Sequence, residues 1–271
     1  MKKDIFIKIW SLTSGIIVVG VILFIFLYIL FKGYNSINFE FIFGNPKGMP
    51  LGTEGGIFPA IAGSLYLGII VAIISSIFSI GTAIYLCFYS KYKKLYDFII
   101  FSIQSISGIP SIVIGLFGYS FLIVKLGMPK SLLVAGITVS IMIVPFITLR
   151  VEKIFSEFTD HVFVASLNLG VSKIYTIYKM VIPFCFWRII SVLSLSVSYA
   201  IGAAAPIMFT GAVLFAKTPT SIMEPFMALP YHLYGLINEG ISIEMAYGTS
   251  FVLLIILIIS NLFCKILSNK G

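Results

Sequence analysis

Long apolar runs without a charged residue dominate this chain of 271 residues. Six runs reach about 19 residues or more, and about 20 apolar residues let a helix cross the hydrocarbon core of a bilayer. Because the runs are continuously apolar and do not alternate, they predict helices and not the strands of a β-barrel. We therefore expect an all-α membrane protein with one domain over residues 1–271 and six transmembrane helices, at about residues 9–31, 60–89, 98–124, 131–149, 189–214 and 245–266.

Composition supports a membrane protein. The chain is 59% hydrophobic and 10% charged, whereas a soluble domain has roughly 25% charged residues. The same low charge excludes intrinsic disorder, which needs many charges and few apolar residues. The first run follows Met1-Lys2-Lys3 and is longer than the apolar part of a signal peptide, so we interpret it as a retained signal anchor.

The basic residues predict the orientation. With six spans, both termini lie on one side, and Lys and Arg concentrate on the cytoplasmic side of membrane proteins. A cytoplasmic N-terminus puts five of the 18 Lys and Arg residues outside, namely Lys32, Lys47, Lys125, Lys130 and Lys217. We therefore expect a multi-pass protein of the cell membrane with both termini in the cytoplasm. The net charge of +8 is spread over several segments, so nucleic-acid binding is not indicated.

Catalytic and metal-binding constellations are not indicated by the sequence. Cys87, Cys185 and Cys264 adjoin apolar runs, where small packing residues are expected. His161 and His232 fall in different loops, where we expect both to be solvated and no metal site. The chain has no acid pair, no nucleophile-base set and no phosphate-binding G-x-x-x-x-G-K-[ST] loop. It is therefore not expected to be an enzyme or to hold a cofactor, and any ATP would be bound by another chain.

Two long segments connect the spans on the predicted outer side. Residues 33–59 are rich in Gly and Pro and predict an irregular loop. Residues 217–244 contain Phe, Met, Tyr and Leu, and they predict a partly helical segment that rests on the membrane surface.

A helical elbow is predicted on the opposite side. Residues 164–183 read VASLNLGVSKIYTIYKMVIP, which is too polar and too broken to cross a bilayer. Residues 159–160, Thr-Asp, can cap a helix over 161–169. Gly170 then suits the left-handed position that follows a helix.

The second arm of the elbow follows directly. Ser172 can cap a helix over residues 173–181, which Pro183 is expected to end or kink. The whole cytoplasmic loop is predicted to run from 150 to 188.

The first arm of the elbow has a small apolar face. Val164, Leu167 and Val171 fall on one side at spacings of three and four, beside Ala165 and Ser166. Such a face can lie in the groove of a partner protein. The alternative is an amphipathic connector on lipid headgroups, although such helices usually carry a basic polar face.

The elbow resembles a known motif, the "EAA" loop of ABC-importer permeases. The residues that fit it at the right spacing are Ala165, Ser166, Gly170, Met180, Ile182 and Pro183. Other stretches resemble the PstA-type permeases of phosphate importers. They are GGIFPAIAGSLYLGIIVAI (55–73), SGIPSIVIGLFGYSF (107–121), VPFITLR (144–150), AIGAAAPIMFTGA (200–212) and FMALPYHLYGLINEG (226–240).

The resemblance implies the type I ABC-importer permease (MetI-like) fold with a cytoplasmic coupling helix. It implies half of a translocation pathway for inorganic phosphate, formed with a homologous, PstC-like second permease. Two copies of a PstB-like ATP-binding subunit and an external PstS-like phosphate-binding protein would complete the importer. The residues implied to couple the chain to the ATPase are Val164, Ala165, Ser166, Leu167, Gly170 and Pro183.

Two positions depart from the family pattern. The family's Glu at the head of the loop motif is Val164 in this chain. The family's Gly-Glu-Thr-Ala-Pro is Gly-Ala-Ala-Ala-Pro at 202–206, so Ala203 stands where an acid is expected. Because acids inside membranes are costly and usually functional, the second change puts the substrate in question.

Five residues are candidates for the substrate pathway. Pro110 and Pro206 are each predicted to break a helix inside an apolar run, with Gly202 beside the second break, and Ser107 could donate its hydroxyl to the anion. Such breaks either are packing kinks or expose backbone groups to a passing anion. Arg150 ends the fourth span, where it either snorkels to the interface or attracts an anion with its planar guanidinium.

Other functions remain open at this point. The missing acid motivates a permease for another oxyanion or small solute, and a phosphate-sensing membrane scaffold is a further alternative. A self-sufficient secondary transporter needs internal repeats and intramembrane acids, and the spans contain no Asp or Glu.

Overall fold

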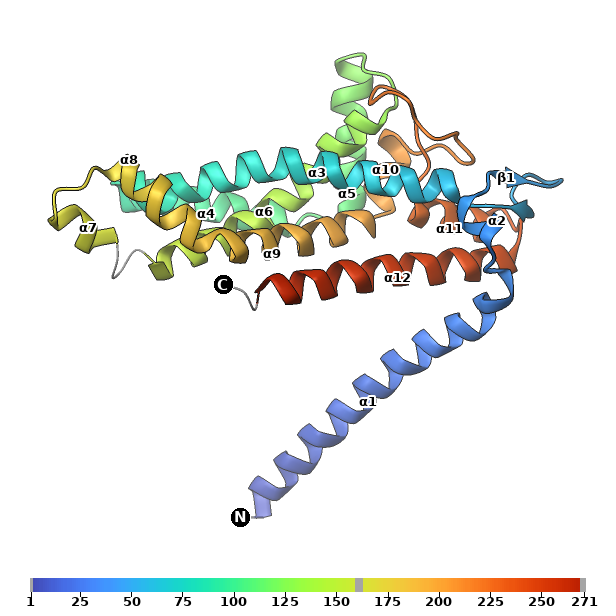
Figure 1. The fold of residues 1–271 in the computed structure, drawn as a ribbon, viewed down its shortest axis with the longest axis horizontal. Coiled ribbons are helices and arrows are strands. Elements are labelled where there is room, and N and C mark those ends of the chain that lie inside the picture. Colours follow the sequence, from blue (N-terminus) through green and yellow to red (C-terminus); the bar gives the residue numbers. More distant parts are fainter. Residues whose placement is uncertain (1, 159–162, 269–271) are drawn as a thin grey trace.

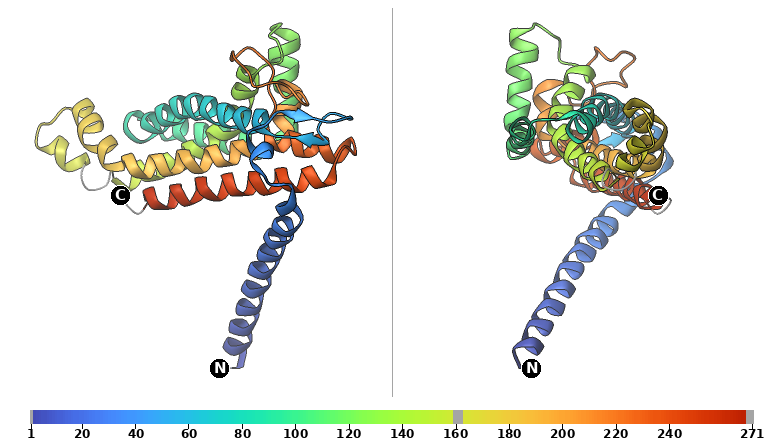
Figure 2. Two further views of the ribbon diagram at one scale, coloured as in Figure 1. Left: turned by 45° about the vertical axis from the view of Figure 1, so that its right-hand side comes forward. Right: turned by 90° about the vertical axis from the view of Figure 1, so that its left-hand side faces the viewer.

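The computed structural model of the chain describes residues 2–158 and 163–268. Four long helices form its centre: α3 (Phe58–Ile84), α6 (Leu132–Phe158), α9 (Ile182–Ile201) and α12 (Ile243–Ser268). Figures 1 and 2 show these helices side by side. Helix α3 packs along α6, and α9 packs against α3, α6 and α12. The predicted all-α membrane architecture is confirmed.

Helix α6 has the most extensive buried face. Val139, Ile143, Ile147 and Val151 recur every four residues and are almost completely buried. This spacing places them on one face of an α-helix, towards the neighbouring helices. Helix α6 also runs through Pro145 and reaches Phe158, nine residues beyond the predicted end of the fourth span.

The third predicted span, 98–124, is not one straight helix. Helix α4 (Lys93–Ser107) ends before Pro110, and α5 (Ser111–Gly118) continues at an angle of 96° through the π-helical η3 (Tyr119–Lys125). Proline has no N–H to donate and disfavours helical geometry in the residue before it. Within the described residues, five helices are long and apolar enough to span a membrane, or six if this bent pair is one span.

The fifth predicted span, 189–214, is displaced and divided. A continuous helical stretch begins at α8 (Lys173–Thr176), passes through the π-helical η5 (Ile177–Val181) and runs to the end of α9 at Ile201. A separate short helix, α10 (Ala205–Thr210), follows the break. Pro183 is predicted to end or kink the helix, and it does not end it: it lies in the first turn of α9, directly after the π-helical η5.

These extensions shorten the loop that the sequence places at 150–188. Helix α6 occupies its first part and the α8–α9 stretch its last part. The predicted cap at Thr159-Asp160 and the start of the helix at His161 lie outside the described residues.

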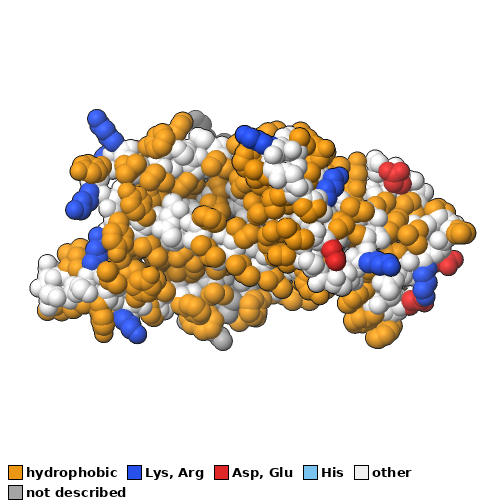
Figure 3. Space-filling model, turned by 90° about the horizontal axis from the view of Figure 1, so that it is seen from above, with side chains coloured by type: hydrophobic (Ala, Val, Ile, Leu, Met, Phe, Trp, Pro, Cys, Tyr) orange, Lys and Arg blue, Asp and Glu red, His pale blue; other side chains and the backbone are white. Residues whose placement is uncertain are grey.

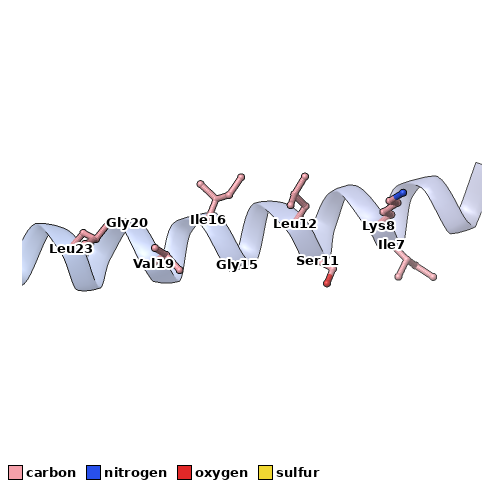
Figure 4. A pocket seen from close by; sticks show the side chains of 9 residues that line it. All are labelled: Ile7, Lys8, Ser11, Leu12, Gly15, Ile16, Val19, Gly20 and Leu23. Carbon is pink, nitrogen blue, oxygen red and sulfur yellow. The ribbon is translucent and has the colours of Figure 1, made fainter. Parts of the chain in front are cut away.

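Helix α1 (Lys2–Gly33) leaves the bundle at its C-terminal end (Figures 1 and 2). Its contact with α12 is made near that end, where the rings of Tyr28 and Tyr247 lie edge to face with centroids 5.9 Å apart. The hollow in Figure 4 is lined by one face of α1 alone, from Ile7 to Leu23. It is the surface of a single helix and not an enclosed site.

The opposite end of the bundle from the elbow has short elements. These are η1 (Tyr34–Ser36), α2 (Phe39–Phe43), the antiparallel pair β1 (Pro46–Lys47) and β2 (Glu54–Gly55), and α11 (Leu229–Asn238). The prediction that residues 217–244 rest on the membrane surface is wrong for its central part. Phe226, Met227, Leu229 and Leu236 are fully buried, because α11 packs between α3 and α12.

The surface has a banded distribution of side chains. Figure 3 shows hydrophobic side chains along the length of the bundle. Lys and Arg side chains lie at the end that carries α7 and α8 and also towards the opposite end, where the visible acidic side chains lie. This arrangement fits a bundle whose apolar sides face lipid.

Candidate functional site

The elbow folds much as its sequence predicts. Helix α7 (Val164–Asn168) ends in a turn in which Gly170 has φ +79°, the left-handed conformation expected of it. The Oγ of Ser172 accepts a hydrogen bond from the backbone N–H of Tyr175 at 3.4 Å and caps α8. Gly170 and Ser172 thus separate the two arms at the predicted residues.

Ser166 has a different role from the one expected of it. Its side chain is buried, and its Oγ lies 3.0 Å from Oγ1 of Thr176 in the second arm. The same hydroxyl lies 2.8 Å from the carbonyl oxygen of Phe163, to which it can donate. Ser166 therefore holds the two arms together and does not belong to the exposed face of the elbow.

The exposed apolar side chains of the elbow extend over both arms. Val164 and Leu167 are exposed as expected, and Leu169 has an exposed fraction of 84%. Ile174 and Tyr178 on the second arm are also exposed. We call these five residues the elbow surface. Leu169, Ile174 and Tyr178 were not predicted to belong to this surface, because helical spacing relates residues within one arm and not across the turn at Gly170.

Aromatic contacts join the elbow to the bundle. The buried ring of Phe163 lies 4.8 Å from that of Phe88, centroid to centroid, and Phe88 lies 5.8 Å from Phe155 of α6. Phe88 belongs to the π-helical η2 (Tyr85–Tyr89), which extends α3. Lys173 stacks over the ring of Tyr89, with Nζ 4.5 Å from its centroid. A displacement of the elbow would therefore be passed to α3, to α6 and, through the continuous α8–α9 stretch, to α9.

The two predicted helix breaks begin helices that pack together. A Cβ atom at Gly115 of α5 would lie 2.8 Å from the Cα of Pro206 in α10, so these backbones touch. Only glycine fits at such a close approach. Pro206 is buried, whereas Gly202, Ser107 and Pro110 are exposed. Pro206 is thus a packing residue.

Arg150 is exposed on α6, where its guanidinium stacks on the ring of Phe146 at 4.3 Å. A stacked guanidinium is preorganised, and its N–H groups remain available for oxygen atoms. Ala203, at the position of the family's acid, is half-buried just after α9 ends.

His232 is not solvated as predicted. It is buried on α11, with Nδ1 3.1 Å from Oγ1 of Thr249, and its ring stands edge to face with Phe215. Thr249 donates its single hydroxyl hydrogen to the carbonyl oxygen of Met245, so Nδ1 of His232 must donate to Thr249. Burial lowers the pKa of His232 to about 4 and keeps the ring neutral. Among the described residues, no three His, Cys, Asp or Glu side chains form a metal-binding group.

Comparisons with known proteins agree with the fold. No protein-family model matches the chain. A probable ABC transporter permease protein, YqgI of Bacillus subtilis, is 26% identical over 264 residues, which cover 92% of this chain and 89% of that protein. A probable phosphate transport system permease protein PstA of Methanocaldococcus jannaschii is 26% identical over 212 residues, covering 75% of this chain and 73% of that protein. The chain is similar to curated PstA-type phosphate transport permeases, including that of Methanocaldococcus jannaschii.

The fold of the chain also matches a solved structure. An inward-facing structure of the MetNI methionine ABC transporter superposes with a TM-score of 0.64 at 15% identity, over 78% of this chain and 94% of that chain. The predicted MetI-like permease fold is confirmed. At this level of identity, the likeness concerns the fold alone.

Proposed function

We propose that this chain is a permease subunit of an ATP-driven importer and forms half of the translocation pathway for inorganic phosphate. The observation that carries the proposal is the elbow. Its surface is apolar and exposed, and it is joined by aromatic rings to the ends of α3 and α6 and by a continuous helix to α9. The names of the PstA relatives support phosphate as the substrate.

The elbow would couple the chain to its motor. Two copies of a PstB-like ATP-binding subunit in the cytoplasm would hydrolyse ATP, and the loop 160–183 would carry their motion to the bundle. A folded elbow suits this task, because a flexible loop would absorb the displacement. The excess of Lys and Arg in the segments predicted to be cytoplasmic supports a cytoplasmic location for the elbow and for both termini.

The remaining partners would complete the pathway. A PstC-like second permease would supply the other half, and an external PstS-like binding protein would deliver phosphate at the end that carries α2 and the β1–β2 pair. Arg150 would attract the anion near the cytoplasmic end of α6. Full phosphate uptake by an Arg150→Lys variant that assembles normally would contradict a bidentate role for this guanidinium.

A second candidate is a permease for another oxyanion or small solute, because Ala203 replaces the family's acid. Co-purification of this chain with its ATPase and second permease, followed by reconstitution into vesicles, tests both candidates. We expect ATP-dependent uptake of radiolabelled phosphate well above that of sulfate or molybdate. Phosphate uptake at background level, with sulfate or molybdate accumulating, would favour the second candidate.

A third candidate function is that of a phosphate-sensing membrane scaffold. It would assemble with the ATPase without moving phosphate, sulfate or molybdate across the membrane. ATP hydrolysis by the isolated chain would contradict all three.

A further inference from the structure

Helix α4 exposes a side-chain amide among apolar residues and serines whose hydroxyls bond carbonyl oxygens of their own helix. Gln104 is exposed, whereas its neighbour Ile103 is buried against the bundle. The side-chain amide of Gln104 has no hydrogen-bond partner in the described chain, over 2–158 and 163–268. A primary amide facing hydrocarbon without a partner costs several kcal/mol. This side chain therefore needs a polar environment that the chain itself does not supply.

The depth of Gln104 follows from a contact between α4 and α6. The hydroxyl of Tyr96 donates to Oε1 of Glu152 at 2.9 Å. Helix α4 begins, and α6 ends, at the elbow end of the bundle (Figure 1). A rise of 1.5 Å per residue then places Gln104 about 12 Å further from that end than Tyr96, near the level of Val144. Gln104 thus lies about 9 Å deeper than Arg150.

The backbone next to Gln104 points to the same environment. Residues Ser107 to Pro110, where α4 breaks, are all exposed. Irregular backbone at membrane depth is tolerated where protein covers it or where it lines a water-filled cavity. An exposed amide and an exposed break within six residues therefore require this face of α4 to meet water or polar groups in the assembled transporter.

We infer that Gln104 lines the conduit and donates hydrogen bonds from its side-chain amide to the oxyanion that passes. The inference rests on the proposed transport function and adds a residue that selects the substrate. An uncharged amide offers two N–H donors to oxygen atoms. A neutral amide binds the anion more weakly than a buried Lys or Arg would, so the anion can dissociate again. The nearest cationic candidate, Arg150, lies closer to the elbow end.

Transport by the full complex in vesicles is the first test. Gln104→Leu keeps the size of the side chain but removes both donors, so we expect uptake at limiting phosphate to fall about tenfold or more. Subunit assembly and ATP hydrolysis should stay normal. The matched control is Ser102→Ala, because the Ser102 hydroxyl bonds only the Phe98 carbonyl oxygen of its own helix, at 2.8 Å. Wild-type uptake by Gln104→Leu would overturn the inference.

Thiol labelling tests the environment of the residue independently of the substrate. In the assembled complex with Cys87, Cys185 and Cys264 replaced by Ser, we expect Gln104→Cys to react with a small membrane-impermeant methanethiosulfonate. Phosphate should slow the reaction. The exposed Ile77 of α3 supplies a lipid-facing control, Ile77→Cys, that should not react.

The two experiments separate the possible failures. If the wild-type complex takes up no phosphate, the proposed substrate is wrong, and labelling still shows whether residue 104 faces water. If the wild type transports but residue 104 stays unlabelled, the side chain bonds the second permease and the inference is wrong. Labelling that phosphate does not slow would contradict direct contact with the anion.

Discussion

The elbow and the external segment around α11 are both rich in apolar residues, but they differ in how far these residues are buried. Both join amphipathic helical pieces outside the main spans. In the external segment, the apolar side chains of Phe226, Met227 and Leu236 are fully buried against α3 and α12. In the elbow, Leu169 and Ile174 remain exposed. The chain thus buries the centre of its external segment by itself, whereas the elbow surface stays exposed, where the proposed ATPase partner would cover it.

The largest expected effect is on the free energy of unfolding, which a Leu→Ala substitution should change much more in the external segment than in the elbow. Leu236→Ala should lower the free energy of unfolding by about 2–5 kcal/mol, because a cavity forms at a fully buried site. Leu169→Ala, the same substitution at an exposed site, should change it by less than about 0.5 kcal/mol. Unfolding of the detergent-solubilised chain with increasing denaturant measures both. Equal losses would show that the elbow is buried within the chain and would remove the comparison.

The pH dependence of the external segment should be the next largest effect. The pKa of His232 is about 4 in the folded chain, against 6.5 in the unfolded chain. The unfolded chain binds the proton first, so the free energy of unfolding should fall as pH drops from about 6.5 towards 4, by about 3 kcal/mol in total.

Two carboxylates also contribute at the acidic end of this window. Hydrogen bonds from Thr220 lower the pKa of Glu224, and a hydrogen bond from Lys47 lowers that of Glu40, so the stability that they contribute is also lost as the pH falls. The control is His232→Gln, which cannot titrate and should abolish this part of the slope. A wild-type slope in His232→Gln would place the titrating group elsewhere.

Coupling by the elbow should be sensitive to the backbone at Gly170. A Cβ there meets no atom within 4 Å, so Gly170→Val would act through the left-handed φ of +79° alone, at a cost of about 1–2 kcal/mol. We expect ATP hydrolysis by the complex to continue while phosphate uptake falls several-fold. Gly170→Asn is the matched control, because Asn tolerates this conformation better. Normal coupling in Gly170→Val would count against the elbow as a transmission element.

The smallest expected effect concerns the bond that holds the two arms together. Ser166→Ala removes the hydrogen bond to Thr176 and should reduce the stability of the elbow by about 1 kcal/mol. Hydrogen exchange of the backbone amides in α7 and α8 measures this local opening. A double-mutant cycle with Thr176→Val should show that the two losses are not additive. Additive losses would mean that the 3.0 Å contact does not contribute.

The sequence by itself determined the membrane class, the approximate spans and the turn of the elbow. These features depend on local chemistry: the length of apolar runs, the preference of Gly170 for positive φ, and the cap supplied by Ser172. The breaks near Pro110 and Pro206 were predictable for the same reason, since proline lacks a backbone donor. The bend of 96° at the first break was not, because its direction depends on what α5 packs against.

Only the tertiary structure decided which apolar and polar side chains are covered. Periodicity places Ser166 and Leu167 on a helix, but the distant Thr176 decides that the serine is inside and the leucine outside. His232 was predicted to be a solvated loop residue, but the packing of α12 places Thr249 within hydrogen-bond distance of it. Gln104 falls within the predicted span 98–124, and its sequence does not show which way it faces. In the structure, Ile103 packs inward and the amide of Gln104 is exposed. Burial is set by contacts between residues far apart in the chain, which a local pattern does not contain.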